Sequence, residues 1–345
     1  MKTLLEIENL DIDYHSNGQW QPAVRGISFA LHAGEILGLV GESGCGKSTL
    51  ARALMRLLPR NGRVSGGKVR FRGMDLLALD EKALLAVRWD EIAMVFQGAM
   101  NVLDPVYTIG DQIVEAIAEH RPRMRRRDMW RQAEELLEGV GIDKARARSY
   151  PHELSGGMRQ RVGIAMAIAL DPALVIADEP TTALDVISQD NILARLSAVQ
   201  KERGFSMILV SHDMGVIAET CDRVAVMYAG SIVELGSVRD IFHRPSHPYS
   251  IGLLGAIVDI HQSRPAIAIP GHPPAGSNRD DGCLFRGRCP FAAPVCASPV
   301  PWMSLEEGHG MLCHFPEKRE AFRRDGKDPH TWDQVADRLR AVEAA

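Results

Sequence analysis

Residues Ile36-Leu37-Gly38-Leu39-Val40-Gly41-Glu42-Ser43-Gly44-Cys45-Gly46-Lys47-Ser48-Thr49 carry the clearest structural signal in this chain of 345 residues. Residues 36–40 form a short, continuous apolar run, which is typical of a strand that is buried on both faces. Residues 50–58, which follow the glycine-rich segment, have the composition of a helix. Strand, glycine-rich loop and helix in this order form the context that a phosphate-binding loop requires.

The loop also has the residue spacing that phosphate binding needs. Gly41 and Gly46-Lys47-Ser48 satisfy the pattern G-x-x-x-x-G-K-[ST]. Its glycines allow backbone N–H groups to close around anionic phosphates at a helix N-terminus. Lys47 is placed to reach the β- and γ-phosphates of a nucleotide, and the Ser48 hydroxyl to ligate Mg²⁺. The expected phosphate-contacting residues are Gly41, Ser43, Gly44, Cys45, Gly46, Lys47, Ser48 and Thr49.

Two further apolar runs end in polar side chains. Residues 173–177 are followed directly by Asp178 and Glu179, and residues 206–210 are followed by Ser211 and then His212. Strands of this kind separated by helices predict a mostly parallel sheet, whose ligands lie at the carboxyl ends of the strands. We therefore expect Asp178 to hold Mg²⁺ directly or through water, Glu179 to orient and polarise an attacking water, and His212 to approach the γ-phosphate.

Composition excludes several classes of protein. The chain is 46% apolar and 24% charged, which argues against intrinsic disorder. Its 40 basic and 44 acidic residues leave a net charge of −4, which does not suggest a general nucleic-acid binder. We expect the basic run 121–127 to be a solvated turn between two helices. No apolar run approaches the roughly 18 residues of a membrane span, and the N-terminus lacks signal-peptide features, so a cytosolic location is expected.

A separate motif joins these elements into one family pattern. Residues Leu154-Ser155-Gly156-Gly157-Met158-Arg159-Gln160-Arg161 resemble the signature of the ATP-binding-cassette (ABC) ATPases. The resemblance implies that two subunits stack head to tail around ATP. Each nucleotide would lie between the phosphate loop of one subunit and Ser155, Gly156 and Gly157 of the other.

Four more positions match elements of this family in the expected order. The resemblance implies that Tyr14 stacks on adenine, with Trp20 as a less favoured substitute. It implies that Gln97 contacts Mg²⁺ and the attacking water and senses a membrane partner, and that Asp185 couples the two sites across the dimer. It implies that His212 is the switch histidine. The catalytic set is then Lys47, Gln97, Glu179 and His212.

A narrower resemblance points to the dipeptide/oligopeptide/nickel importers. It rests on residues 41–46 and 97–105, on His247-Pro248-Tyr249, and on the pattern Gly282-Cys283-x-Phe285-x-x-Arg288-Cys289-Pro290. It implies an ATP-hydrolysing subunit that powers uptake of peptides or related solutes at the cytoplasmic face of the inner membrane. Its implied partners are a second ATPase subunit of different sequence, two transmembrane permease subunits and an extracytoplasmic solute-binding protein, with no nucleic acid.

A soluble ABC ATPase that acts on ribosomes or DNA is the alternative. Such proteins usually carry two cassettes, or long insertions within the cassette, and this chain has one phosphate loop and no such insertion. One departure from many importer relatives is Cys45, where they carry serine. Its thiol is expected to make ATP hydrolysis sensitive to alkylation.

The expected fold is α/β. It combines an ABC-type phosphate-loop core with a RecA-like, mostly parallel sheet, an N-terminal antiparallel β subdomain, a helical signature subdomain and a loop-rich C-terminal extension. The expected divisions are a cassette over 1–240 with its helical subdomain at about 100–160, an importer-type extension over 241–320, and a variable tail over 321–345.

Four cysteines, Cys283, Cys289, Cys296 and Cys313, gather in the extension. Their spacings do not fit the paired C-x₂-C arrangement of a common zinc ribbon. Four thiolates in an irregular loop can hold a [4Fe–4S] cluster, and the importer resemblance implies the same. Zinc, with His309 or His314 completing the ligands, and free or disulfide-bonded thiols are the alternatives.

Overall fold

The apolar run before the phosphate loop is strand β3 (Ile36–Val40), and every residue in it is buried. The computed structural model describes residues 2–98, 102–181, 186–256, 266–274 and 281–343. Strand β3 lies between β8 (Ser206–Val210) and β9 (Arg223–Tyr228) and runs parallel to both. Strands β7 (Leu174–Asp178) and β6 (Ile92–Val95) continue the parallel part of the sheet. The loops that follow β3, β7 and β8 therefore all leave the sheet at the same edge, where the carboxyl ends of these strands lie.

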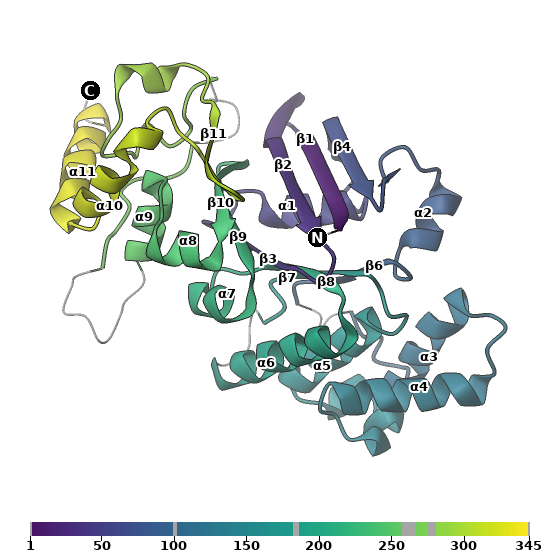
Figure 1. Cartoon of the computed structure of the whole chain (residues 1–345). Coiled ribbons are helices and arrows are strands. Elements are labelled where there is room, and N and C mark those ends of the chain that lie inside the picture. Colours follow the sequence, from purple (N-terminus) through teal and green to yellow (C-terminus); the bar gives the residue numbers. More distant parts are fainter. Residues whose placement is uncertain (1, 99–101, 182–185, 257–265, 275–280, 344–345) are drawn as a thin grey trace.

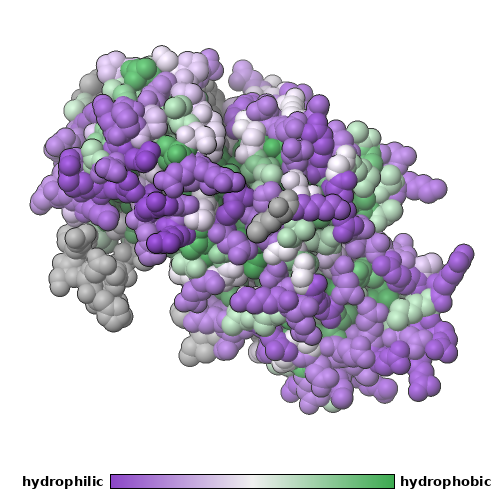
Figure 2. Space-filling model, viewed as in Figure 1, coloured by the Kyte–Doolittle hydropathy of each residue, from purple (hydrophilic) through white to green (hydrophobic). Residues whose placement is uncertain are grey.

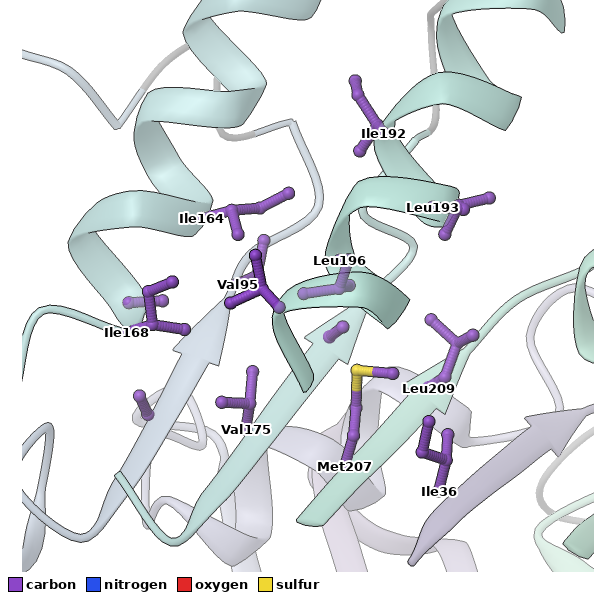
Figure 3. Close-up of a cluster of buried hydrophobic side chains, with 14 of the residues drawn as sticks. Ile36, Val95, Ile164, Ile168, Val175, Ile192, Leu193, Leu196, Met207 and Leu209 are labelled. Atoms are coloured by element: carbon purple, nitrogen blue, oxygen red, sulfur yellow. The ribbon is translucent and has the colours of Figure 1, made fainter. Parts of the chain in front are cut away.

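These strands are apolar at successive positions because each face of the sheet meets a different core. Ile36 and Val40 belong to the core shared with the helices, whereas Leu37 and Leu39 belong to the core shared with the N-terminal strands. Figure 3 shows the first core, in which side chains of the sheet face α5 (Gly156–Ala167) and α6 (Val186–Arg203). A strand covered on both sides needs this continuous apolar pattern.

The expected N-terminal antiparallel subdomain is present as a second sheet. Its strands follow the order β2-β1-β4-β5, and α1 (Lys47–Leu54) packs into the core between this sheet and the main one. Helix α2 (Glu81–Val87) follows the sheet. The bounds of its strands are β1 (Thr3–Ser16), β2 (Gln19–His32), β4 (Gly62–Phe71) and β5 (Met74–Asp75).

The polar segment 15–21 forms the end of a hairpin. Strand β1 continues to Ser16 and β2 begins at Gln19, so only Asn17 and Gly18 form the turn. Their φ angles are 52° and 78°. Positive φ at both central residues is the geometry of a two-residue type I′ turn, for which Asn-Gly is the preferred sequence.

The helical subdomain has one helix on each side of the basic run. Helix α3 (Ile109–His120) ends just before the run, and α4 (Arg126–Gly139) begins within it, so the expected turn between two helices covers only the first part of the run. Arg121 forms an ion pair with Asp90. Short 3₁₀ segments at Lys144–Arg148 and Pro151–Glu153 lead into α5. In the view of Figure 2, the outer surface over α3 and α4 is largely hydrophilic.

The C-terminal extension has more regular structure than the sequence predicts. Strand β10 (Ser231–Ser237) forms a hairpin with β9, and β12 (His309–Leu312) pairs with β10. Strand β11 (Trp302–Glu306) then pairs with β12, so the extension continues the main sheet. Helix α7 (Met214–Thr220) precedes β9 within the cassette. The helices of the C-terminal part, on the left in Figure 1, are α8 (Val238–His243), α9 (Pro248–Gly255), α10 (Arg319–Asp325) and α11 (Pro329–Glu343). A short 3₁₀ segment spans Pro294–Ala297 and another spans Pro316–Lys318.

One buried group attaches the extension to the cassette, and another packs the C-terminal helix against the extension. Glu234 of β10 is fully buried and accepts hydrogen bonds from the backbone N–H groups of Ser246 and His247. Its carboxylate also lies 3.0 Å from Nε2 of His309 in β12. In the C-terminal segment, Trp332 of α11 is 2% exposed and packs against Gly252 of α9. Within the described residues, no helix is both long and apolar enough to span a bilayer.

Replacing Trp332 with alanine is expected to lower the free energy of unfolding by about 3–5 kcal/mol, because it leaves a cavity between α11 and α9. Thermal unfolding of the full chain measures the effect. Asp333→Ala is the matched control, since the neighbouring Asp333 side chain is 71% exposed. Equal unfolding midpoints for the two variants would contradict a packed C-terminal helix.

Candidate functional site

The phosphate loop curls around its own lysine. Nζ of Lys47 donates hydrogen bonds to the carbonyl oxygens of Gly41 at 2.8 Å and Glu42 at 3.0 Å. Gly41 has a φ of 148°, and a Cβ there would lie 2.1 Å from the carbonyl oxygen of Met227. Only glycine fits this close approach, and the result is a ring of backbone at the N-terminus of α1, with a buried ammonium inside it.

The next residue joins this loop to strand β7. The Ser48 hydroxyl donates to Oδ1 of Asp178 at 2.7 Å. Asp178 is 1% exposed, and its Oδ2 has no hydrogen-bond partner among the described residues. Burial raises the pKa of Asp178, and the hydrogen bond from Ser48 opposes that rise. A buried carboxylate oxygen without a partner, beside a hydroxyl, suits a hard divalent cation that prefers oxygen ligands.

Three polar side chains meet at the ends of neighbouring strands. Nε2 of Gln97, after β6, donates to Oε2 of Glu179 at 2.8 Å. Nδ1 of His212, after β8, lies 3.9 Å from Oε1 of the same carboxylate. Glu179 has a φ of 45°, and its N–H donates to the carbonyl oxygen of Val210. The structure therefore brings together Gln97, Glu179 and His212, as the sequence predicts.

Tyr14 of β1 contacts the phosphate loop from the N-terminal sheet. Its hydroxyl lies 3.4 Å from the hydroxyl oxygen of Thr49. Trp20 lies in the hairpin instead, with the guanidinium of Arg63 3.9 Å from its ring centroid. Of the two aromatic candidates from the sequence, Tyr14 is thus the one that lies beside the loop.

The signature residues lie at the start of α5. Ser155 caps this helix by accepting a hydrogen bond from the N–H of Met158 at 3.3 Å, and Gly156 and Gly157 form its first turn. Helix α5 packs in the helix-side core, whereas α1 packs in the opposite core. Figure 1 shows these two helices on opposite sides of the main sheet. Asp185 lies outside the described residues.

Two contacts to the loop have no counterpart in the sequence prediction. The hydroxyl of Tyr249, in α9, accepts the N–H of Glu42 at 2.9 Å. Nη1 of Arg288 donates to Oε2 of Glu42, also at 2.9 Å. Both residues belong to the importer-type motifs, but no sequence signal identifies Glu42, more than 200 positions away, as their partner.

The four cysteines of the extension lie near one another. The N–H of Cys283 donates to the carbonyl oxygen of Cys296 at 2.8 Å. Burial, together with the neighbouring Cys296 and Cys313, raises the pKa of the Cys283 thiol to about 11. Backbone N–H groups two positions onward donate to three of the sulfurs, those of Cys283, Cys289 and Cys313. All four are free thiols. Across the described ranges, however, no three His, Cys, Asp or Glu side chains are close enough to hold a metal ion.

Comparison with known proteins identifies the family of this chain. Residues 24–182 match the ABC transporter family, and residues 233–296 match the oligopeptide/dipeptide transporter C-terminal region. A putative peptide import ATP-binding protein of Brucella abortus is 47% identical over 90% of this chain and 94% of its own length. The chain belongs to the ABC transporter ATP-binding proteins. It is an ATPase subunit of that type.

Two further relatives extend the comparison. The dipeptide transport ATP-binding protein DppD of Bacillus subtilis is 40% identical to this ABC protein over 92% of the chain and 96% of its own length. The solved structure of the cassette MJ0796, a dimer in a post-hydrolysis state bound to ADP and Pi, is similar with a TM-score of 0.62 and 27% identity. That likeness covers 68% of this chain and 99% of the other. The α/β fold is that of an ABC cassette.

The structure of this ABC protein does not favour the sensitivity to alkylation expected from the sequence, because the loop thiol is buried, and we expect it to react slowly with maleimides. Cys45 is 2% exposed, and burial raises the pKa of its thiol. Because the thiolate is the nucleophile, its labelling rate is expected to stay below that of a free thiol near neutral pH and to rise only at higher pH. Peptide-resolved mass spectrometry measures the rate, with Cys45→Ser as the control. Labelling as fast as that of free cysteine would show that the thiol is accessible.

Proposed function

We propose that this chain binds and hydrolyses ATP to power the import of peptides or related solutes. The observation that carries the proposal is the convergence of Lys47, the Ser48–Asp178 pair and the Gln97–Glu179–His212 group at one edge of the sheet. The printed names of its relatives, which describe peptide import and dipeptide transport, support this class of solute.

The chain's own groups suggest how the reaction proceeds. Lys47 lies inside the phosphate loop, where its ammonium would stabilise charge on the β- and γ-phosphates. Glu179 would orient and polarise the attacking water, with Gln97 fixing its carboxylate and His212 facing the γ-phosphate. The ring of Tyr14, beside Thr49, would stack on adenine.

Magnesium fits the donors that the chain offers. Asp178, Ser48 and Gln97 would hold the ion, since all three supply oxygen and Asp178 keeps one buried oxygen without a partner among the described residues. When bound, Mg²⁺ neutralises charge on the phosphate oxygens. The protein contributes few ligands, which is usual where substrate phosphates complete the coordination.

A second ATPase subunit would complete each site. Ser155, Gly156 and Gly157 lie on the opposite side of the sheet from α1, so they are available to a neighbouring subunit rather than to the same loop. The dimeric state of the similar cassette supports this arrangement, and Asp185 would couple the two sites. We propose that the second subunit differs in sequence, as the importer resemblance implies.

The surface beside Gln97 is suited to a membrane-spanning partner. Phe96 is 37% exposed and Val102 is 50% exposed, and both line an apolar pocket with Trp89 and Met166. The motion by which the ATPase dimer closes and reopens would be transmitted to two permease subunits through Gln97 and this surface. An extracytoplasmic solute-binding protein would deliver the solute, and the chain would work as a peripheral subunit at the cytoplasmic face of the inner membrane.

Glu179→Gln tests the hydrolytic role. The variant is expected to bind ATP normally and to hydrolyse it about 100-fold or more slowly, because an amide cannot accept a proton from the attacking water. Glu135→Gln is the control, since Glu135 is exposed on α4. Phosphate release and equilibrium ATP binding are the measurements. Turnover of Glu179→Gln at the rate of the control would remove Glu179 from this role.

We also propose that Cys283, Cys289, Cys296 and Cys313 hold a [4Fe–4S] cluster with a structural role. Four neighbouring thiols that accept backbone hydrogen bonds support it, since such bonds are common at cluster ligands. The thiols as described do not form a complete ligand set, so they would have to converge on the cluster.

Anaerobic purification of the full chain tests this proposal. Iron and acid-labile sulfide are expected at four of each per chain, with a brown colour that Cys289→Ser removes. Zinc in place of iron, or neither metal, would contradict the cluster.

A further inference from the structure

Arg288 forms a largely buried ion pair with the second residue of the phosphate loop. Its Nη1 lies 2.9 Å from Oε2 of Glu42, and the two side chains are 6% and 25% exposed. Nη1 also donates to the hydroxyl of Tyr228 at 3.3 Å. Nε and Nη2 donate to the carbonyl oxygens of Pro270 and Ile269. The guanidinium is thus held on several sides, and its position relative to Glu42 is fixed.

These contacts come from the extension rather than from the cassette's own strands. Arg288 follows Cys283 and immediately precedes Cys289. From α9, Tyr249 accepts the backbone N–H of the same Glu42. The extension therefore holds both the side chain and the main chain of one loop residue. Because the carbonyl oxygen of Glu42 also accepts from Nζ of Lys47, a displacement of Glu42 would be transmitted to the lysine.

We infer that Arg288 is a positioning residue for the nucleotide site, and that it sets ATP affinity by neutralising Glu42 and holding the phosphate loop in place. This inference rests on the proposed ATP site. A carboxylate in the loop that binds a triphosphate repels it unless a cation is paired with that carboxylate. Arg288 supplies this cation through a charge-assisted hydrogen bond and takes no part in the chemistry itself.

The inference predicts a specific pattern of ATP affinities. Arg288→Met leaves Glu42 charged and unpaired, so the Kd for MgATP is expected to rise about tenfold, which corresponds to about 1.4 kcal/mol. Glu42→Gln in the same chain removes the repelling charge, so the double variant is expected to return to within about twofold of the wild type. In hydrolysis, KM should rise in Arg288→Met more than kcat falls, because Glu179 and His212 are unchanged.

Arg338→Met is the matched control. Arg338, in α11, donates to the carbonyl oxygens of Gly287 and Cys289, so it contacts the same segment as Arg288. Its removal leaves the Arg288–Glu42 pair in place, and wild-type affinity is expected.

Equilibrium titration of the full-length wild type and the three variants with MgATP decides the question, with thermal unfolding recorded for each. Weak binding by Arg288→Met, rescued by Glu42→Gln, supports the inference. Wild-type affinity in Arg288→Met overturns it, as does a double variant that binds as weakly as the single one. Failure of the wild type itself to bind MgATP would instead overturn the proposed function, and this inference with it.

Discussion

The parallel pairing of β3, β7 and β8 is the constraint on which the rest of the structure depends. Hydrogen bonds between these strands place their carboxyl ends at one edge, and every residue within them is buried. Because the two faces of the sheet pack into different cores, a one-residue shift of a strand would disturb both cores at once. The positions of Ser48, Asp178 and His212 therefore follow from the packing of strands β3, β7 and β8.

The extension is part of this arrangement rather than an addition beside it. Strand β12 pairs with β10, and buried Glu234 binds the backbone of Ser246 and His247. These contacts hold the extension where Tyr249 and Arg288 can bind the phosphate loop. The nucleotide site of this ABC protein therefore includes residues from both the N-terminal and the C-terminal parts of the chain. Arg288, which contacts the phosphate loop, is followed directly in the sequence by Cys289, one of the four cysteines of the extension.

Local sequence patterns predicted much of the fold and the site. The apolar runs ending at Val40, Ala177 and Val210 identified three central strands, since a strand that is buried along its whole length consists mostly of apolar residues. Parallel topology then predicted that Glu179 and His212 would meet, and they do. The recognised family pattern supplied Tyr14 and Gln97, whose contacts with Thr49 and Glu179 no composition or spacing could have predicted.

Features that depend on distant partners were missed. Strands β11 and β12 are short, and their place in the sheet depends on pairing with β10 rather than on their own sequence. The burial of Trp332 depends on its contact with Gly252, about 80 residues earlier.

The most direct test of this account is the effect of Mg²⁺ on ATP affinity in the full chain and in its Asp178→Asn variant. If the Ser48–Asp178 pair is the metal site, Mg²⁺ will tighten ATP binding in the wild type, and most of that gain will be absent from the variant. An equal gain in both proteins would contradict the account, because the metal would then be held elsewhere.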